Sequence, residues 1–315
     1  MSDEKLLVDS ASKIFSDHCD KSILDGSEIG SYATDLDSTL AANGFFELAR
    51  RDSGFSLESA FLLLREAGKY AVPIPMAEIL LGARWINQDV RASVGVVLDK
   101  KIIGVPWASK AEIIIGVEDG KEEAYKVIDK KVVSGKNIAG ESREEVLLDG
   151  PVALDMGGDF GYELLALARV AQTVGALERI LDLTLSYANE REQFGRPIAK
   201  FQAIQHNLAI LAGEVAAAVR AGDAGIAALS TPRQRLEIAS SKARVNEAAG
   251  VVVEIAHQVH GAMGFTHEHQ LHHFTRRAWA WREEFGNEIY WRQELGQHIA
   301  GLGPDGVWPF IATRG

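Results

Sequence analysis

The sequence has 315 residues, 47% of them hydrophobic, so the chain can bury a substantial core in one to three units. Its 44 acidic residues outnumber 33 basic ones, and the net charge of -11 argues against nucleic acid as a partner. A single cysteine, Cys19, excludes an intramolecular disulfide and a multi-cysteine zinc site. With an acidic N-terminus and no apolar run of about 18 residues, we expect a cytoplasmic protein without a membrane span.

Two kinds of pattern follow each other in the first half of the chain. Up to about residue 90 the apolar residues recur at helical spacing, most clearly after Ser56, a residue type typical of helix N-caps. We predict an N-terminal helical domain over residues 1–90. Residues 91–155 instead contain short β-rich runs such as "ASVGVVL" and "EIIIGVE", separated by Gly, Asp and Lys. They predict a reduced middle β domain, built as an antiparallel sheet or barrel.

Helical spacing returns in the C-terminal half, residues 156–315, and continues almost to the end. It falls into four long blocks, at 162–189, 199–228, 232–260 and 267–299. Long helices joined by short corners form an antiparallel four-helix bundle. The predicted fold is therefore mainly α with a small β domain between two helical units.

The first corner of the bundle reads "EREQFGRPI". Gly195 and Pro197 end the preceding helix, because glycine tolerates left-handed angles and the residue before proline avoids helical ones. Arg191 and Arg196 also place charged donors beside the aromatic Phe194, which suits a flat anionic ligand such as a nucleotide. The alternative is a solvated corner with Phe194 as its plug.

The second corner reads "AHQVHGAMGFTHEHQ". Gly261 and Gly264 would let the backbone approach a ligand closely, and Gln258 could hydrogen-bond it from the end of its helix. Gln202, which opens the helix after the first corner, offers a further amide. The two corners together favour a nucleotide-like ligand.

Both corners resemble patterns of the acyl-CoA dehydrogenase family. The pattern Y-x-x-x-R-x-Q-F-G-x-P-I-x-x-F-Q is matched by Tyr187, Arg191, Gln193, Phe194, Gly195, Pro197, Ile198, Phe201 and Gln202. The pattern Q-x-x-G-G-x-G-[YF] is matched by Gln258, Gly261, Gly264 and Phe265, with Ala262 in place of one glycine. The resemblance implies FAD as cofactor, an acyl-CoA thioester as substrate and an electron-transfer flavoprotein as electron acceptor.

The resemblance also assigns the cofactor contacts. In this family Arg191 and Phe194 would contact FAD, and the turn at residues 258–264 would meet the FAD of a neighbouring subunit. The implied FAD-binding set is Arg191, Phe194, Gln202, Gln258, Gly261, Ala262 and Gly264. A shared flavin site implies an oligomer, with copies of this chain or with a full-length dehydrogenase subunit.

A dehydrogenase of this family needs a carboxylate that removes the α-proton of the thioester while hydride leaves the β-carbon for flavin. The family often carries this base in a Y-E-G-T-x-E-I-like segment, to which "WREEFGNEIYW" corresponds. The resemblance places Glu284 in the base position, with Phe285 and Gly286 where Gly and Thr are expected. The alternative is that Glu283 and Glu284 are solvated helix charges paired with a nearby arginine, Arg282 or Arg276.

Other departures from the family pattern bear on catalysis. Some relatives carry the base on the first bundle helix, where this chain has Leu165, followed by Ala166 in place of a substrate-contacting arginine. The middle region also lacks a segment like T-E-P-x-x-G-S-D, which usually covers flavin and substrate. The chain is similar to a shortened subunit of heteromeric dehydrogenases that act on steroid side chains, although a compact homomeric enzyme is the alternative.

Metal-dependent and non-catalytic functions are the remaining alternatives. His269 and His273 would share a helix face as zinc ligands can, but no carboxylate or cysteine pattern completes the set. A di-iron bundle needs two Glu-x-x-His motifs, and only Glu254 with His257 fits. We therefore predict no metal. A scaffold or partner protein without chemistry of its own would also fit a bundle that lacks the middle-domain motif.

Overall fold

A computed structural model describes residues 3–87, 91–118, 125–126, 132–147, 152–153 and 161–313. The N-terminal part is helical, as the spacing of its apolar residues predicts. It comprises α1 (Asp3–His18), α2 (Lys21–Ile29), α3 (Thr34–Ala42), η1 (Phe45–Glu47), α4 (Leu57–Lys69) and α5 (Met76–Ile86). Helix α4 follows Ser56 and buries Phe61, Leu63 and Leu64, so its apolar face packs inward as the 3.6-residue period requires.

The middle part is a five-stranded sheet of order β3-β1-β2-β6-β5, beside a separate β4–β7 pair. Its strands are β1 (Ala92–Leu98), β2 (Lys101–Val105), β3 (Ile113–Val117), β4 (Tyr125–Lys126), β5 (Val132–Val133), β6 (Glu144–Leu147) and β7 (Val152–Ala153). The expectation of a purely antiparallel sheet is wrong, because β1 and β3 pair in parallel while the other pairs are antiparallel. The chain crosses from β2 through η2 (Ala108–Lys110) to the free edge of β1, which makes a parallel pair.

The C-terminal part is a helical bundle. Its helices are α6 (Tyr162–Glu190), α7 (Gln202–Ala227), α8 (Gln234–His260), α9 (Leu271–Glu283), α10 (Glu288–Leu302) and α11 (Pro304–Thr313). The first three predicted blocks each form one helix, but the fourth, 267–299, is wrong as a single helix. It breaks where Phe285 and Gly286 adopt positive φ angles of 56° and 89° and where Asn287 caps the start of α10.

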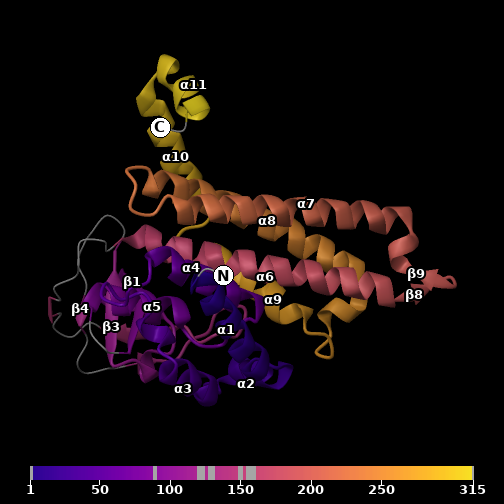
Figure 1. The fold of residues 1–315 in the computed structure, drawn as a ribbon, viewed down its shortest axis with the longest axis horizontal. Helices are drawn as coiled ribbons and strands as arrows, with labels where there is room; N and C mark the ends of the chain where they lie inside the picture. Colours follow the sequence, from indigo (N-terminus) through magenta and orange to yellow (C-terminus); the bar gives the residue numbers. More distant parts are fainter. Residues whose placement is uncertain are drawn as a thin grey trace.

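Helix α6 is central, packing against α4, α7, α8 and α9 (Figure 1). One hydrophobic core extends from α1 through α4, α5 and one face of the sheet into the bundle. A smaller core around Ile102, Ile114 and Val146 covers the other face of the sheet. Figure 1 shows the sheet at one end of the bundle, the β8–β9 hairpin at the other, and α11 projecting from the body. No helix in the described part of the chain is both long and apolar enough to span a membrane.

Two glycines allow α4 and α6 to approach each other closely. A Cβ atom at Gly175 would lie 1.9 Å from the backbone oxygen of Arg65, and one at Gly68 would lie 2.1 Å from that of Gln172. Neither backbone atom can swing away as a flexible side chain could. The contact between the two helical parts of the chain therefore depends on the absence of these side chains.

Gly175→Ala is expected to lower the free energy of unfolding by about 1–3 kcal/mol, because the added methyl group forces the two helices apart. Gly213→Ala is the matched control, since a Cβ atom at Gly213 on α7 would meet nothing within 4 Å. The control should be neutral or more stable by about 0.5–1 kcal/mol, through helix propensity alone. Urea unfolding measures both, and equal effects would contradict the close helix contact.

Candidate flavin and acyl-CoA site

The first corner is a β-hairpin rather than a simple loop. Helix α6 ends at Glu190, and β8 (Glu192–Gln193) pairs with β9 (Arg196–Pro197). The two residues between the strands, Phe194 and Gly195, have φ angles of 51° and 79°. Positive φ at both positions is typical of a tight two-residue hairpin turn, and it is unfavourable for an aromatic residue. The turn therefore holds a phenyl ring in a conformation that costs free energy.

The side chains of this hairpin point into solvent. Phe194 is 92% exposed, so it is not a plug of the corner. Arg191 is also exposed, and its guanidinium has no hydrogen-bond or ion-pair partner among the described residues. Arg196 instead stacks its guanidinium over Phe201, 4.3 Å from the ring centre. The hairpin thus exposes the Arg191 cation and the Phe194 ring, whose centre lies 6.0 Å from that of Phe201 in an edge contact.

The second corner lies against the first. Helix α8 ends at His260, and Gly261 has a φ of 60° and a ψ of -139°, a backbone conformation open to glycine and strained for other residues. The chain continues as η4 (Gly261–Phe265). Tyr187 of α6 stacks on His260 with 4.4 Å between ring centres, and its hydroxyl donates to the His260 carbonyl oxygen at 3.3 Å. This contact joins the end of α6 to the end of α8.

A cavity of about 610 Å³ lies between the two corners. Of the residues predicted to bind FAD, five line it: Arg191, Phe194, Gln258, Gly261 and Ala262. Gln202 and Gly264 do not. Gly264 is buried, and a Cβ atom there would come within 3.1 Å of His257 Nδ1, so helix packing already explains this glycine. The cation, the amide and the aromatic face suit one end of a dinucleotide, so the residues present fit FAD.

Glu284, the predicted base, lies just after α9 and is held by two arginines. Arg143 Nε donates to its Oε1 at 2.7 Å, and Arg169 Nε donates to its Oε2 at 2.6 Å. Asn137 Nδ2 adds a bond of 3.2 Å to Oε1. The alternative of a solvated helix charge is thus wrong for Glu284, because the break after α9 turns this carboxylate inward. It holds for Glu283, the last residue of α9, which is exposed and lies 4.0 Å from Arg282 Nε.

These contacts set the charge of the carboxylate. Burial raises the pKa of Glu284, but the charges and hydrogen bonds of Arg143 and Arg169 outweigh burial and lower it to about 2. A carboxylate with so low a pKa is a weak proton acceptor at neutral pH. It has to lose at least one arginine contact before it becomes a stronger base.

Glu284 also borders open space. A cavity of about 520 Å³ is lined by β1, β2, residues 136–138, Tyr162 and the loop between α9 and α10. Apolar groups make up most of its wall, while Glu284 and Arg143 lie at its border. The cavity therefore places an apolar volume next to a carboxylate, which is what an acyl chain beside a base would need.

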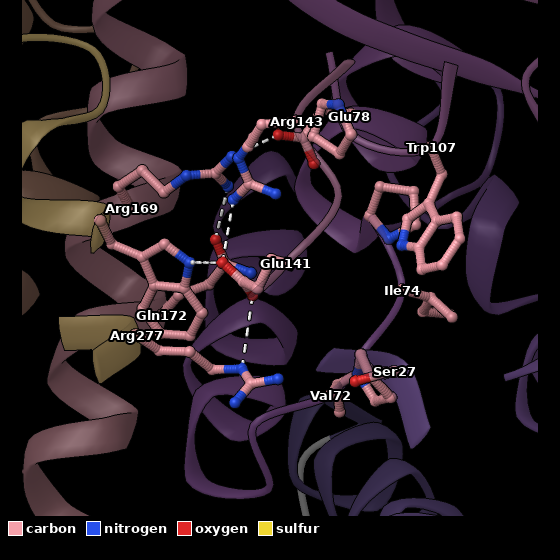
Figure 2. Close-up of a pocket in the computed structure, with 14 residues that line it drawn as sticks. Ser27, Val72, Ile74, Glu78, Trp107, Glu141, Arg143, Arg169, Gln172 and Arg277 are labelled. Atoms are coloured by element: carbon pink, nitrogen blue, oxygen red, sulfur yellow. Dashed lines mark hydrogen bonds and ion pairs between the residues drawn. The ribbon is translucent and has the colours of Figure 1, made fainter. Parts of the chain in front are cut away.

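The ion pairs continue from Glu284 into the interior. Arg169 is 2% exposed and also donates to Glu78, whose side chain is 1% exposed, and to Gln172 Oε1 at 2.7 Å. Figure 2 shows Glu141 lying between Arg143 and Arg277, at N–O distances of 3.1 Å and 3.4 Å. Sequence reasoning missed this network. Its only signal was a charge inside an apolar helix, as in "LLALARVAQ" and "PMAEILLGA".

A buried lysine supports the loop that carries Glu284. Lys242 of α8 is fully buried, and its Nζ donates to the Trp281 carbonyl oxygen at 2.7 Å at the end of α9. Burial lowers the pKa of Lys242 to about 7. Asn246 Nδ2 donates to the Arg282 carbonyl oxygen at 3.0 Å. The two side chains satisfy carbonyl groups that the end of α9 leaves open, which holds the following loop in place.

The comparisons with known proteins identify the family. A family model described as "Acyl-CoA dehydrogenase, C-terminal domain" matches residues 162–299. A relative described as acyl-CoA dehydrogenase IpdE2, from Mycolicibacterium smegmatis, is 30% identical over 235 residues, which cover 72% of this chain and 74% of that protein. The chain belongs to the acyl-CoA dehydrogenase family, whose members are flavoprotein oxidoreductases that typically bind FAD.

Solved structures show the same fold. The ChsE4-ChsE5 complex from Mycobacterium tuberculosis contains a chain with a TM-score of 0.82 and 18% identity, covering 95% of this chain and 98% of that one. A chain of the Tcur3481-Tcur3483 steroid acyl-CoA dehydrogenase variant has a TM-score of 0.83 and 21% identity, with the same coverage. The predicted fold class, mainly α with a small β part, is confirmed.

Proposed function

We propose that this chain is one subunit of a heteromeric, flavin-dependent acyl-CoA dehydrogenase, in which it completes a flavin site shared with a full-length partner subunit. The observation that carries the proposal is the cavity between the two corners, where Phe194 is exposed and Arg191 is exposed without a hydrogen-bond or ion-pair partner among the described residues. The two solved structures of heteromeric assemblies that share this fold support it. Electrons would pass to an electron-transfer flavoprotein, as the family resemblance implies.

Each cavity residue has a distinct part in holding FAD. Arg191 would neutralise the diphosphate, Phe194 would offer an aromatic face, and Gln258 would hydrogen-bond a polar group. The backbone at Gly261, free of a Cβ atom, would allow close approach. When bound, the flavin supplies the hydride acceptor of the reaction.

The Glu284 contacts bear on whether this chain completes a partner's site or performs the chemistry itself. The Glu284 carboxylate already forms ion pairs with Arg143 and Arg169. These contacts favour a structural role for Glu284, with the catalytic base on the partner subunit. The second candidate is catalysis by this chain, with Glu284 taking the α-proton of an acyl-CoA in the adjoining cavity of about 520 Å³. That cavity is the observation that favours it.

The test is Glu284→Gln in the complex of this chain with its co-purifying dehydrogenase subunit. We expect acyl-CoA-dependent dye reduction to stay within about 2-fold of wild type, because glutamine keeps the size of a residue that does not take the proton, although its amide group can accept from only one of the two arginines. If Glu284 is the base, turnover falls about 100-fold or more while flavin remains bound. Glu283→Gln, at an adjacent exposed position, is the matched control, and flavin absorbance reports intact assembly.

The same preparation separates a subunit from a complete enzyme. The isolated chain is expected to retain little flavin and to reduce no dye, and both properties should appear with the partner subunit. An isolated chain that binds one FAD per copy and turns over acyl-CoA would refute the heteromeric assignment.

A further inference from the structure

A cluster of histidines lies outside the flavin and acyl-CoA cavities, at the junction of the N-terminal helices with the bundle. His272 and His273 lie in the first turn of α9, and Asp25 lies on α2. Each offers one ligand atom, and these atoms lie within 4.8 Å of one another. His273 is 0% exposed and His272 is 8% exposed, so both imidazoles are buried.

The hydrogen bonds of the two rings determine which nitrogen carries the proton. His273 Nδ1 lies 2.7 Å from Glu28 Oε1, and His272 Nδ1 lies 2.8 Å from the His269 carbonyl oxygen. A carboxylate and a carbonyl oxygen only accept hydrogen bonds, so each Nδ1 must donate. In the neutral ring each Nε2 then carries a lone pair.

Both Nε2 atoms are buried and lack a hydrogen-bond partner within the described ranges. Asp25 Oδ1 is 3.2 Å from His273 Nε2, yet it does not form a hydrogen bond with it. The other oxygen of this carboxylate, Oδ2, is taken by Lys21 Nζ at 2.6 Å. With neutral rings, two imidazoles and a carboxylate therefore lie together with no hydrogen-bond partner for either Nε2 atom among the described residues.

We propose that Asp25, His272 and His273 bind a divalent transition-metal ion of the zinc type. Nitrogen and carboxylate ligands suit such an ion, and about 3.3 Å between neighbouring ligand atoms is what tetrahedral zinc with bonds of about 2.0 Å requires. The Nε2–Oδ1 separation of 3.2 Å meets this value. Binding at Nε2 with Nδ1–H donated to a carboxylate or carbonyl is also the arrangement that orients histidine ligands in metal sites.

The residues around the three proposed ligands leave room for the ion to enter and for a further ligand. Asp25 is 43% exposed at its side chain, so an ion can enter from its side. A remaining coordination position is open to water or to exposed His267, whose ring centre lies 5.5 Å from that of His272. Glu28 is already balanced by Arg276 and Arg277, at 2.9 Å and 3.0 Å. The ion would cross-link α2 to α9 and stabilise the contact between the N-terminal helices and the bundle.

The experiment uses the tag-free full chain, stripped with a chelator and titrated with Co²⁺ and Zn²⁺. We expect one Co²⁺ per chain with the intense visible bands of a four-coordinate site, and a Tm increase of about 5 °C when Zn²⁺ is about 100-fold above its Kd. Asp25→Asn keeps the shape of a half-exposed side chain and should weaken Zn²⁺ binding about 10-fold or more. His272→Asn, which removes a second ligand, should act in the same direction.

His206→Asn is the matched control, because His206 is exposed on α7 and lies outside the cluster. Its Zn²⁺ affinity should equal that of wild type. Affinity unchanged in both Asp25→Asn and His272→Asn would show an adventitious surface ion only and overturn the proposal. Absence of bound Co²⁺ and of any Tm increase in the wild-type chain would overturn it as well.

Discussion

Arg169→Met is expected to lower the free energy of unfolding by about 3–5 kcal/mol, which is typical of removing one partner from a buried ion pair. Methionine fits the space of the arginine stem, so the loss is mainly one of charge and hydrogen bonds. It leaves Glu78, 1% exposed at its side chain, without the guanidinium that it contacts, and takes one of two arginines from Glu284. Urea unfolding measures the effect.

Two controls separate a buried network from an ordinary ion pair. Lys101→Met breaks a pair whose side chains are 46% and 43% exposed, and should cost about 0–1 kcal/mol. Adding Glu78→Gln to Arg169→Met removes the uncompensated carboxylate and should restore part of the stability. A cost of Arg169→Met no larger than that of Lys101→Met would contradict the network.

The pH dependence of the free energy of unfolding provides a second test of Arg169→Met. The pKa of Glu284 in the folded chain, about 2, lies below its ordinary value of 4.5. Its contribution to stability is therefore complete above pH 4.5 and is lost as the pH falls toward 2. Arg169→Met removes one cause of the lowered pKa, so this acid-dependent loss should become smaller.

Arg191→Ala is expected to weaken FAD binding by about 10- to 100-fold, because a charge-assisted hydrogen bond to phosphate contributes about 1.5–3 kcal/mol. The exposed guanidinium has no partner to lose among the described residues, so the stability of the fold should change little. Flavin absorbance after gel filtration, with and without the partner subunit, measures the retained cofactor.

Arg220→Ala is the matched control for this variant. Arg220 is an exposed arginine of α7, with a side chain 83% exposed and a single pair to Asp223 at 3.3 Å. Arg220 has the same charge as Arg191, but it lies outside the cavity between the two corners. Equal flavin content in Arg191→Ala, Arg220→Ala and wild type would refute the assignment of Arg191.

Much of the fold could be predicted because helical periodicity is a local signal. The first three bundle blocks end within three residues of α6, α7 and α8, since apolar spacing and corner residues lie in the same stretch. The parallel pairing of β1 with β3 could not be predicted, because pairing between separated strands leaves no local pattern. The break at residues 284–287 was hidden by an apolar spacing that continues from α9 into α10.

The candidate site divides in the same way. The corner motifs indicated Arg191, Phe194 and Gln258, and the structure brings these residues to one cavity. Their binding of FAD stays a prediction. The partners of Glu284 could not be predicted from the sequence. Arg169 lies 115 residues away, and no pattern in either segment indicates that the two residues are in contact. An isolated buried charge predicts that a partner exists but not where it lies.

The ion pairs around Arg169 also limit the modularity of this chain. Glu78 comes from α5, Arg143 from the residue before β6, Arg169 from α6, and Glu284 from the loop after α9. Each of the three sequence regions thus contributes charges that pair with charges of another region, within one continuous hydrophobic core. A gene fusion that exchanged the middle region alone would leave Glu284 without one of its two arginines unless the incoming region supplied another. The three regions therefore depend on one another for stability, although their sequence patterns change sharply at the boundaries.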